Sequence, residues 1–421
     1  MSKVSIILTS YNKPLSVGQS IESVLDQTEE DWELFVMDDN SNKETREIIY
    51  SYLGDPRISY FNSEINDSER YKTTRYAVLI NEAIPRTSGQ FLTYLTDDTF
   101  YLPNRLEAMT DYFSKNPSVE IVYSSQKVEY MNHQQKVMYV MMLPADKILT
   151  RAAHSVDHCS VMHSRIIAEK IYLKYESYWN IDPKYWFNAD AEFWTRLNEL
   201  EPFYPISEVL EISQKTPHSF QNLSSMLPET IPDGTIVKGL TEDLYLIDGQ
   251  IRRFLTKEMF IRLKFNNIVE IPDPILFKYP EGKAVSEKTL PNQLLIKSCE
   301  NEAIYYIQKC KKRLIKNSEA FLKYHFDEQK IIELDSSYLN QFSDGPDISE
   351  SINQKTVLPD GILFSFDQKY YLSFENRLCF IQTDIGSFKL KLPLSRAVPL
   401  SKDEFTYFLQ GITYIWEPPL I

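Results

Sequence analysis

Short apolar runs alternate with helically spaced apolar residues over about the first 220 residues of the chain. The run 4–8 is typical of a buried strand, the apolar positions between 17 and 25 have helical spacing, and the run 34–37 is typical of a second strand. Strand, helix and strand in this order make a right-handed βαβ unit. The pattern predicts three further elements: a strand at 58–61, a helix around 75–83 and a strand at 91–95. We therefore expect an α/β sheet domain over residues 1–225.

Polar residues follow three of the predicted strands. Thr9 comes after the first strand, Asp39 after the second, and Asp97 and Asp98 after the strand at 91–95. In open α/β sheets, ligands bind at the carboxyl ends of the strands. The sequence thus predicts that side chains far apart along the chain converge on one crevice.

Past about residue 225 the pattern changes to short β-like runs separated by turns, and it repeats. Similar segments surround Tyr245, Tyr306 and Tyr371, which we align as equivalent positions. Two further sets recur with them: the pairs Phe260–Phe265 and Phe321–Phe326, and the glycines Gly282, Gly345 and Gly411. A Pro-Asp-Gly turn opens the first and third copies, at 232–234 and 359–361.

We expect three β-rich copies, each a β-hairpin with a short helix, such as 257–263 in the first, and a further extended segment. Each copy is too small to bury its own apolar face, so the copies should pack on one another. The predicted repeat domain covers 228–421, with units at about 230–285, 290–347 and 356–415. No carboxylate or histidine cluster recurs in the copies, so we expect docking or self-association rather than catalysis. The alternative is a lid that shapes a site of the first domain.

Charge and cysteine content restrict the class of protein. Lys and Arg number 45 against 59 Asp and Glu, a formal net charge of −14, so nucleic acid is not expected as a partner. No run approaches the roughly 18 apolar residues of a membrane span. The four cysteines lack metal-type spacing, and the chain opens on a strand rather than a secretory signal. We therefore expect residence in the cytoplasm.

The pair Asp97-Asp98 is the first candidate for chemistry. The diphosphate of a nucleotide ligand must be neutralised when it leaves, and Mg²⁺ or Mn²⁺ does this through carboxylate and water oxygens. Capping of the helix that follows Pro103 is the alternative. His218 is a candidate for an additional metal ligand or phosphate contact, against the alternative of an exposed histidine.

Asp39, Tyr11 and Arg70 are of types that suit a uracil or thymine base. A fixed carboxylate accepts the ring N–H, an aromatic side chain stacks, and an arginine reaches carbonyls or phosphates. Turn formation is the alternative for Asp39, and ordinary packing or a solvated charge is the alternative for the other two.

Asp190 begins an amphipathic helix, where a carboxylate serves equally as a helix cap or as a general base for an acceptor hydroxyl. The segment 156–163 brings Asp157, His158 and Cys159 together along the sequence. Its spacing favours neither a metal site nor Cys-His catalysis. We interpret it as a strand that lines an acceptor pocket, with a core histidine as the alternative.

These motifs together resemble family 2 glycosyltransferases of the GT-A fold, and most closely the spore-coat polysaccharide glycosyltransferases of bacilli. The resemblance covers about residues 1–220 and runs in order through the segments 4–13, 37–42, 74–77, 94–98 and 156–163. It implies a GT-A, Rossmann-like nucleotide-sugar-binding domain followed by the repeat region. It also implies inverting transfer of a sugar from a UDP- or dTDP-sugar to a glycan or protein acceptor, with Mn²⁺ or Mg²⁺ as cofactor.

The resemblance also assigns roles to individual residues. The positions that match base-binding residues are Thr9, Tyr11, Asp39 and Arg70. Asp97 matches the ribose-phosphate position, and Asp98 matches the metal ligand. Asp190 matches the general base, with Asp157 as the runner-up, and Asp157 and His158 fall near the acceptor.

With its repeats, the whole chain resembles maturation glycosyltransferases of the outermost spore layer. This implies spore-layer partners for the repeats, and a location in the mother-cell cytoplasm with association with the spore surface. The competing function is a catalytically silent protein that binds a nucleotide or glycan within that layer. The joint occurrence of Asp39, Asp97, Asp98 and Asp190 favours an enzyme.

Overall fold

The computed structural model describes residues 3–300, 302–382 and 389–411. They form two compact units, with the boundary in the sequence between Leu223 and Ser224. Each unit is described by itself. Among the described residues, every helix is too short or too polar to cross a membrane.

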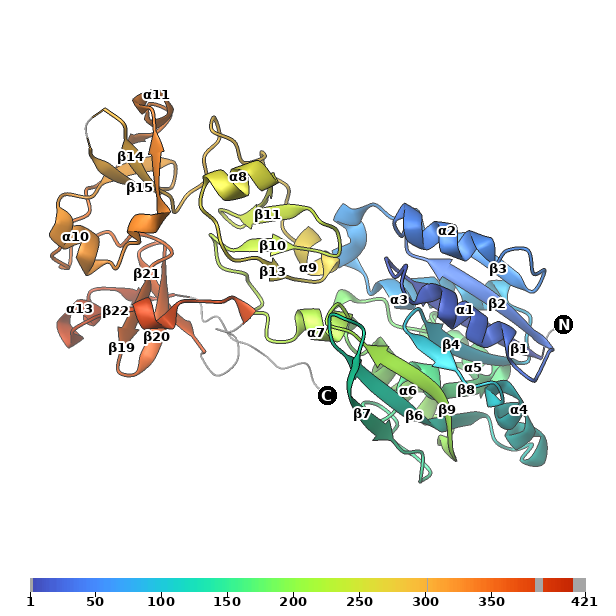
Figure 1. The fold of residues 1–421 in the computed structure, drawn as a ribbon. Helices are drawn as coiled ribbons and strands as arrows, with labels where there is room; N and C mark the ends of the chain where they lie inside the picture. Colours follow the sequence, from blue (N-terminus) through green and yellow to red (C-terminus); the bar gives the residue numbers. More distant parts are fainter. Residues whose placement is uncertain (1–2, 301, 383–388, 412–421) are drawn as a thin grey trace. The chain divides into compact units, whose positions relative to one another are not determined.

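The first unit is built on a nine-stranded mixed sheet (Figure 1). In spatial order its strands are β3 (Ile58–Asn62), β2 (Trp32–Asp38), β1 (Val4–Ser10), β4 (Phe91–Thr96), β8 (Val161–Ser164), β6 (Ile121–Met131), β9 (Tyr204–Lys215) and β5 (Thr99–Tyr101), with β7 (Val137–Leu143) paired to β6. The first four strands are parallel, and β8 turns the sheet antiparallel at β4. β1 is buried along its whole length, which explains its continuous apolar run.

Helices cover both faces of this sheet (Figure 1). The α-helices are α1 (Val17–Leu25), α2 (Lys43–Ser51), α3 (Arg75–Ala83), α4 (Arg105–Lys115), α5 (Arg165–Tyr175), α6 (Ala189–Asn198) and α7 (Phe220–Ser224), and the 3₁₀ turns are η1 (Asp67–Lys72), η2 (Ile84–Arg86), η3 (His158–Ser160) and η4 (Pro183–Tyr185). α1, α2 and α4 pack on one face, and α3, α5 and α6 on the other. The strands and helices predicted up to residue 95 are confirmed.

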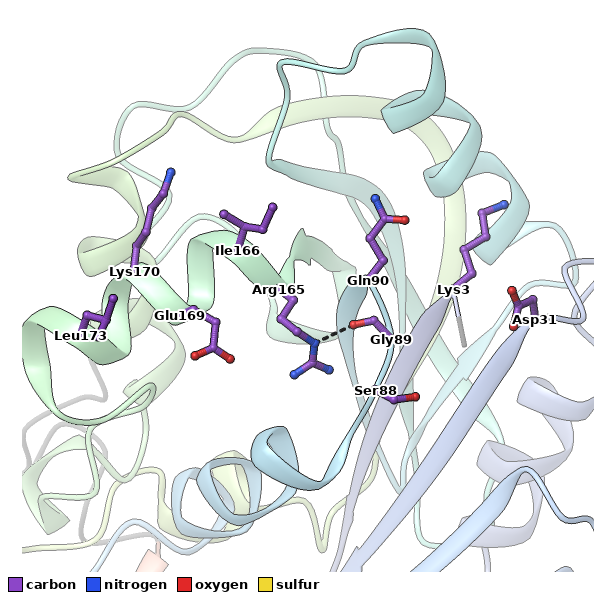
Figure 2. A pocket seen from close by; sticks show the side chains of 10 residues that line it. All are labelled: Lys3, Asp31, Ser88, Gly89, Gln90, Arg165, Ile166, Glu169, Lys170 and Leu173. Atoms are coloured by element: carbon purple, nitrogen blue, oxygen red, sulfur yellow. Dashed lines mark hydrogen bonds between the residues drawn. The ribbon is translucent and has the colours of Figure 1, made fainter. Parts of the chain in front are cut away.

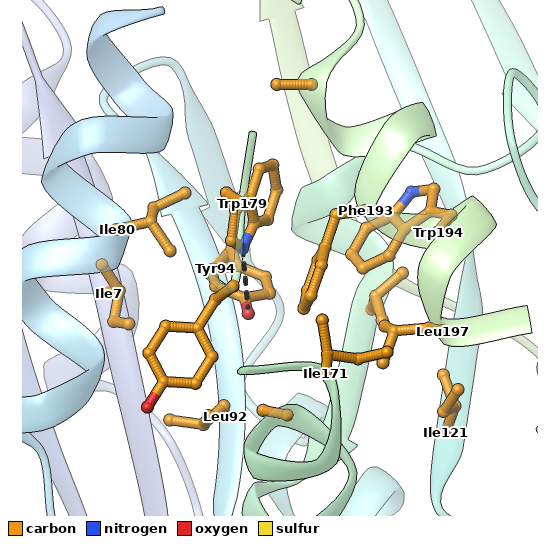
Figure 3. Packing of buried hydrophobic residues seen from close by; sticks show 14 of the residues in the cluster. Ile7, Ile80, Leu92, Tyr94, Ile121, Ile171, Trp179, Phe193, Trp194 and Leu197 are labelled. Atoms are coloured by element: carbon orange, nitrogen blue, oxygen red, sulfur yellow. Dashed lines mark hydrogen bonds between the residues drawn. The ribbon is translucent and has the colours of Figure 1, made fainter. Parts of the chain in front are cut away.

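An aromatic core lies between the sheet and α6 (Figure 3). Trp179 packs against Phe193 with ring centroids 5.0 Å apart, and its indole N–H donates to the Tyr94 hydroxyl at 3.4 Å. His163 contacts the same hydroxyl at 2.8 Å. These contacts fix the start of α6, where Asp190 lies, against the strand that ends in Asp97 and Asp98.

The second unit contains three small sheets of the same construction. Each has a three-stranded antiparallel meander and a later strand parallel to the first, and in the first two sheets a short helix, Lys257–Arg262 or Ser318–Lys323, precedes that strand. The strands are β10 (Ile236–Lys238), β11 (Leu244–Ile247), β12 (Arg252–Leu255) and β13 (Val269–Glu270); β14 (Leu295–Ser298), β15 (Ile304–Gln308), β16 (Lys311–Leu314), β17 (Ile331–Leu334) and β18 (Ser343–Asp344); and β19 (Leu363–Phe366), β20 (Lys369–Phe374), β21 (Arg377–Ile381), β22 (Val398–Pro399) and β23 (Leu409–Gln410).

Short helices complete these sheets: α8 (Lys257–Arg262), α9 (Asp273–Phe277), α10 (Ser318–Lys323), α11 (Ser336–Leu339) and α13 (Lys402–Thr406), with the 3₁₀ turns η5 (Glu328–Lys330) and η6 (Leu394–Arg396). The predicted architecture, an α/β domain followed by three β-rich repeats, is confirmed. The third expected unit, 356–415, includes residues 383–388 and 412–415, which lie outside the described part.

Hydrogen bonds identify the equivalent residues of the three repeats. The backbone N–H of Gly234, Gln293 and Gly361 donates across the meander to Ile247, Ile307 and Ser373, at 2.8, 2.7 and 2.8 Å. The glycines that close the repeats are also equivalent, because Gly282, Gly345 and Gly411 each donate to the third strand of their own repeat.

One alignment made from the sequence is wrong. Tyr245 and Tyr371 lie opposite Val237 and Phe364, in the middle of the first strand pair. The residue in that position of the second repeat is Tyr305 and not Tyr306. Two adjacent tyrosines made the slip of one residue invisible in the sequence, although such a slip places a side chain on the other face of a strand.

The three repeats also close into a ring. Lys264 of the first repeat donates to the Ile331 carbonyl of the second at 2.6 Å, and His325 of the second contacts the Arg396 carbonyl of the third at 2.9 Å. Lys391 of the third returns to the Ile268 carbonyl of the first at 3.2 Å. Each repeat therefore contacts both others.

Candidate active site

The carboxyl ends of the parallel strands gather the residues that the sequence singled out. Tyr11, just after β1, donates its backbone N–H to Asp97 Oδ2, after β4, at 2.8 Å. Asp39, after β2, donates its backbone N–H to the Ser10 carbonyl at 2.9 Å. Residues almost 90 positions apart thus form one site, as expected from the sheet topology.

Asp39 and Arg70 form the buried corner of this site. Arg70 Nη1 lies 2.5 Å from Asp39 Oδ2, and the two side chains are 1% and 4% exposed. Arg75 adds a second cation at 2.7 Å from Oδ1, and the Ser63 hydroxyl donates to the same oxygen at 2.9 Å. The Arg70 guanidinium lies 3.9 Å from the centre of the Tyr11 ring, so one face of that ring is covered.

Asp97 is buried at the end of β4. Burial, reinforced by the neighbouring charge of Asp98, raises its pKa to about 7, although Lys13 acts in the opposite direction. A carboxyl group that is partly protonated at neutral pH can donate as well as accept a hydrogen bond. This suits contact with a ribose hydroxyl or a phosphate oxygen.

Asp98 is the more open member of the pair. Its side chain is 15% exposed, its Oδ1 accepts a hydrogen bond from the Thr96 hydroxyl at 2.8 Å, and its Oδ2 lies 3.8 Å from Lys13 Nζ. Burial lowers the pKa of Lys215, but the charges of Asp98 and Asp157 outweigh this and raise it. Two ammonium groups therefore accompany the carboxylate at this edge.

The donor set at Asp98 fits a hard divalent cation. Mg²⁺ binds through one or two carboxylates and completes its shell with water and substrate phosphates. Within the described residues, the group of three potential ligands that comes together is Asp157, His158 and Cys159, and it includes neither Asp98 nor His218. A cation at Asp98 would thus take its other ligands from water and phosphate.

His218, considered as an additional ligand, lies beside another histidine. Its ring centroid is 5.8 Å from that of His133, which follows β6. A role at the metal remains a prediction for His218.

Asp190 lies in the first turn of α6, 21% exposed, and its Oδ2 is 3.9 Å from His158 Nδ1. The His158 ring stacks on Tyr76 with centroids 5.9 Å apart. Burial lowers the pKa of His158, but Cys159, Asp190 and Asp157 outweigh it and raise the pKa well above the usual value. The structure thus places a cationic imidazole beside the Asp190 carboxylate.

Asp157 and His158 do not lie on a strand, contrary to the prediction. Asp157 caps the 3₁₀ turn η3, accepting the Cys159 N–H at 2.9 Å, and the strand begins only at Val161. Burial raises the pKa of Asp157, but the charges of His158 and Lys215 lower it overall. The cap explains the contact between Asp157 and Cys159 without a metal ion.

A buried ion pair supports the η3 turn through hydrogen bonds to its backbone. Arg105 and Glu211 are both fully buried, with Nε 3.2 Å from Oε2, and Arg105 Nη2 donates to the Cys159 carbonyl at 2.6 Å. Ser124 donates to Glu211 Oε2 at 2.8 Å and contacts the Ser160 carbonyl at 3.2 Å. This network fixes the backbone that carries Asp157 and His158.

Sequence reasoning missed Arg75, Lys13 and Lys215. Arg75 and Lys13 lie inside segments that carried the family resemblance, next to residues that were singled out. Their roles as counter-charges depend on which carboxylates they meet in three dimensions. For Arg75 and Lys13, position inside those segments was the only signal in the sequence.

A pocket of the same unit lies away from these residues (Figure 2). It is lined by Lys3, Asp31 and Gln90, which precede β1, β2 and β4, and by Arg165, Ile166 and Leu173 on α5. It therefore belongs to the amino ends of the parallel strands. None of the predicted site residues lines it.

Comparisons with known proteins agree with this architecture. The family model described as "Glycosyl transferase family 2" matches residues 5–172. The chain is 42% identical over 374 residues to Protein CgeD of Bacillus subtilis, covering 89% of this chain and 87% of that protein. It is 33% identical over 125 residues to the Escherichia coli UDP-Glc:alpha-D-GlcNAc-diphosphoundecaprenol beta-1,3-glucosyltransferase WfgD, covering 30% of this chain and 46% of that protein.

Among solved structures, TarS of S. aureus superposes with a TM-score of 0.40 at 14% identity, covering 52% of this chain and 38% of that one. The family assignment rests on the sequence matches, which extend from the strand-end motifs of the first unit through nearly the whole chain. The chain belongs to glycosyl transferase family 2.

Proposed function

We propose that the first unit transfers a sugar, with inversion, from a UDP- or dTDP-sugar to a hydroxyl group of a glycan or protein acceptor. The observation that carries the proposal is the convergence of Asp39, Asp97, Asp98 and Asp190 around one sheet edge, each with a different set of partners. The UDP-glucose named for WfgD supports a uridine donor.

The nucleotide would lie against the Asp39 corner. Arg70 and Arg75 hold the Asp39 carboxylate in one orientation, so it can accept the ring N–H of uracil or thymine without reorganisation. Tyr11, whose ring contacts the Arg70 guanidinium, would stack on the base. Thr9, also buried at the end of β1, completes the expected base-binding set.

The diphosphate would lie at Asp97 and Asp98. Asp98 would hold Mn²⁺ or Mg²⁺, whose positive charge offsets the charge that develops on the leaving diphosphate. Lys13 and Lys215 add two cations at the same edge and reduce the repulsion between the carboxylates and the phosphates.

Asp190 would act as the general base. The acceptor hydroxyl gives its proton to Asp190, its oxygen forms a bond to C1 of the sugar, and the bond from C1 to the diphosphate oxygen breaks on the opposite face. His158, with Nδ1 3.9 Å from Asp190 Oδ2, would hold the Asp190 carboxylate in position before this step. Asp157 is the runner-up, but its carboxylate already caps η3, and although burial raises its pKa, the charges of His158 and Lys215 lower it overall, which reduces its strength as a base.

Donor turnover tests this proposal against the alternative of a silent binding protein. The intact chain with Mn²⁺ should hydrolyse its donor slowly in the absence of acceptor, and Asp98→Asn should abolish this. Asp111→Asn, the same change at an exposed carboxylate of α4, should leave it unchanged. Binding of nucleotide-sugars without any turnover would establish the silent alternative. A thermal-shift screen ranks the donors, because a ligand at 100 times its dissociation constant adds about 2.7 kcal/mol of stability.

We further propose a role in polysaccharide maturation of the spore outer layer, with synthesis in the mother-cell cytoplasm and attachment or self-association through the repeats. The sequence resemblance to spore-coat glycosyltransferases and the extended likeness to a Bacillus subtilis protein support this. A fluorescent fusion followed through sporulation tests it, since persistent diffuse signal in the mother cell would contradict attachment to the spore.

A further inference from the structure

A cavity of about 280 Å³ opens within the second unit where the three repeats come together. Each repeat contributes two equivalent segments, the turn before its first strand and the loop before the strand that runs parallel to the first. The lining residues come from 232–236 and 263–269, from 292–295 and 324–330, and from 361–363 and 390–396. Its size is close to the lower end of small-molecule sites, about 300 Å³. We call it the junction cavity.

The three repeats differ at the residue where the opening turns meet. Gly234 and Gly361 have φ values of 87° and 79°, and Gln293 occupies the equivalent position at 63°. A Cβ atom on Gly234 or Gly361 would lie 2.2 or 2.3 Å from Gln293 Oε1. The amide of Gln293 thus fills space that the two glycines leave open. A glutamine at positive φ is strained where glycine is not.

A strained backbone conformation persists only where something compensates for its cost, and strained residues concentrate at functional sites. Gln293 places a group with both hydrogen-bond donors and acceptors in the cavity lining. Gly234 and Gly361 show that glycine adopts this backbone conformation at the equivalent positions of the other two repeats. The glutamine therefore has a role that the backbone does not require.

Two lysines and a histidine occupy the other equivalent position of the lining. Lys264, His325 and Lys391 are exposed, have φ values of 55°, 51° and 53°, and each makes one hydrogen bond to a carbonyl of the next repeat. An ammonium group has three donors, so each lysine retains two. Lys330 adds a further cation to the lining.

The acidic residues of the lining have partners. Asp327 is paired with Arg396 at 2.6 Å, and Asp233 accepts the N–H groups of Gly249 and Gln250 at 2.9 and 3.0 Å. The junction cavity thus presents cations with spare donors, in a chain whose formal net charge is −14. Such a site attracts an anion.

We propose that the junction cavity binds one anionic sugar residue of a glycan, a uronate or a phosphorylated sugar. Lys264 and Lys391 neutralise its carboxylate or phosphate, and the Gln293 amide pairs with its hydroxyl groups. The choice of a sugar rests on the proposed function, whereas the requirement for an anion follows from the lining alone. The repeats would then hold the glycan on which the first unit acts.

Calorimetric titration of the intact chain with glucuronate, glucose 6-phosphate, glucose and inorganic phosphate tests this. We expect either anionic sugar to bind at least about tenfold more tightly than glucose, because a charge-assisted hydrogen bond contributes that much. Both should also bind more tightly than inorganic phosphate, which lacks the hydroxyl groups that Gln293 contacts. Equal binding of glucose or of inorganic phosphate would overturn the proposal.

Two variants locate the site. Gln293→Gly restores the residue of the other repeats, so the melting temperature should not fall, while affinity for glucuronate falls about three- to tenfold. Lys264→Ala with Lys391→Ala should weaken binding further, and Lys257→Ala with Lys402→Ala, the same charge change on exposed helix residues of the same repeats, should not. Unchanged affinity in Gln293→Gly would place the ligand elsewhere and overturn the proposal. Titration without donor is independent of catalysis, so donor turnover by the same preparation reports separately on the proposed function.

Discussion

The strand-end site of the first unit and the junction cavity of the second differ in the sign of the charged groups that they present. In the first, carboxylates gather at one edge and cations from elsewhere in the fold pair with them. In the second, cations line an open cavity, and its acidic residues are paired with an arginine of the lining or with backbone N–H groups. The first arrangement suits a site completed by a divalent cation, and the second suits an anion directly.

The repeats also provide an internal control that the first unit lacks. Asp233, Asn292 and Asp360 all accept N–H groups from the hairpin turn of their own repeat, so that contact is structural. Gln293 departs from its two equivalents, so it calls for a functional explanation. The first unit has no repeats to compare. Its structural and functional residues therefore have to be distinguished by the contacts that each one makes, and mutations can test that distinction.

The largest effect is expected for Asp190→Asn. Loss of a general base costs about 10²- to 10⁴-fold in the rate of transfer, with donor affinity preserved. Steady-state kinetics and donor titration of the same variant measure the two quantities. Asp111→Asn is the control. A wild-type transfer rate would exclude this role for Asp190 and make Asp157 the next candidate.

Arg70→Ala should have the next largest effect, because it leaves the buried Asp39 with a single cation. Removing one partner of a buried pair costs about 3 to 5 kcal/mol of stability. Urea denaturation should show that loss, and calorimetry should show weaker UDP binding. Arg75→Ala is the matched variant, and its smaller expected cost follows from its greater exposure of 13%. Equal losses of stability and of UDP affinity in Arg70→Ala and Arg75→Ala would refute the conclusion that Arg70 is the more deeply buried and stronger partner of Asp39.

Two histidines of the first unit, His158 and His163, have pKa values that are shifted in opposite directions. Burial lowers the pKa of His163 to about 4, so at pH 7 its ring is neutral. Burial also lowers the pKa of His158, but Cys159, Asp190 and Asp157 raise it overall, so its ring is charged. NMR signals of the two rings at pH 7, assigned with His158→Gln and His163→Gln, measure this. The same protonation state for both rings would contradict the described contacts.

These shifts have opposite consequences for stability. The unfolded chain protonates His163 near pH 6.5 and the folded chain near pH 4. His163 thus contributes stability above about pH 6.5 that is lost as the pH falls toward 4. The contribution of His158 is present below about pH 6.5 and lost as the pH rises through its raised pKa.

The smallest effect is expected from truncation after Leu223. Each unit has its own apolar clusters, so residues 1–223 should fold and hydrolyse donor at the wild-type rate. Circular dichroism and donor hydrolysis measure folding and activity. Loss of hydrolysis by the folded fragment would show that the repeats belong to the active site, as in the lid alternative.

Sequence reasoning succeeded where one local pattern decides the outcome. β1 and β4 are buried and predominantly apolar, and the carboxyl-end rule then places Asp97 and Asp98 at the site. It failed where a contact joins distant segments. The charges of Arg75 and Lys215 could not be assigned, because their carboxylate partners are fixed only by the sheet order. The η3 turn at His158 resembles a strand in pattern because its neighbours are buried and apolar.

The proposed transfer depends on binding of the donor diphosphate to Asp98 through a divalent cation. Calorimetric titration of UDP into the intact chain with Mn²⁺, with EDTA, and into Asp98→Ala with Mn²⁺ tests this binding most directly. We expect EDTA and Asp98→Ala each to reduce UDP affinity at least about tenfold, the size expected for a lost charge-assisted contact. UDP affinity unchanged by both EDTA and Asp98→Ala would contradict it.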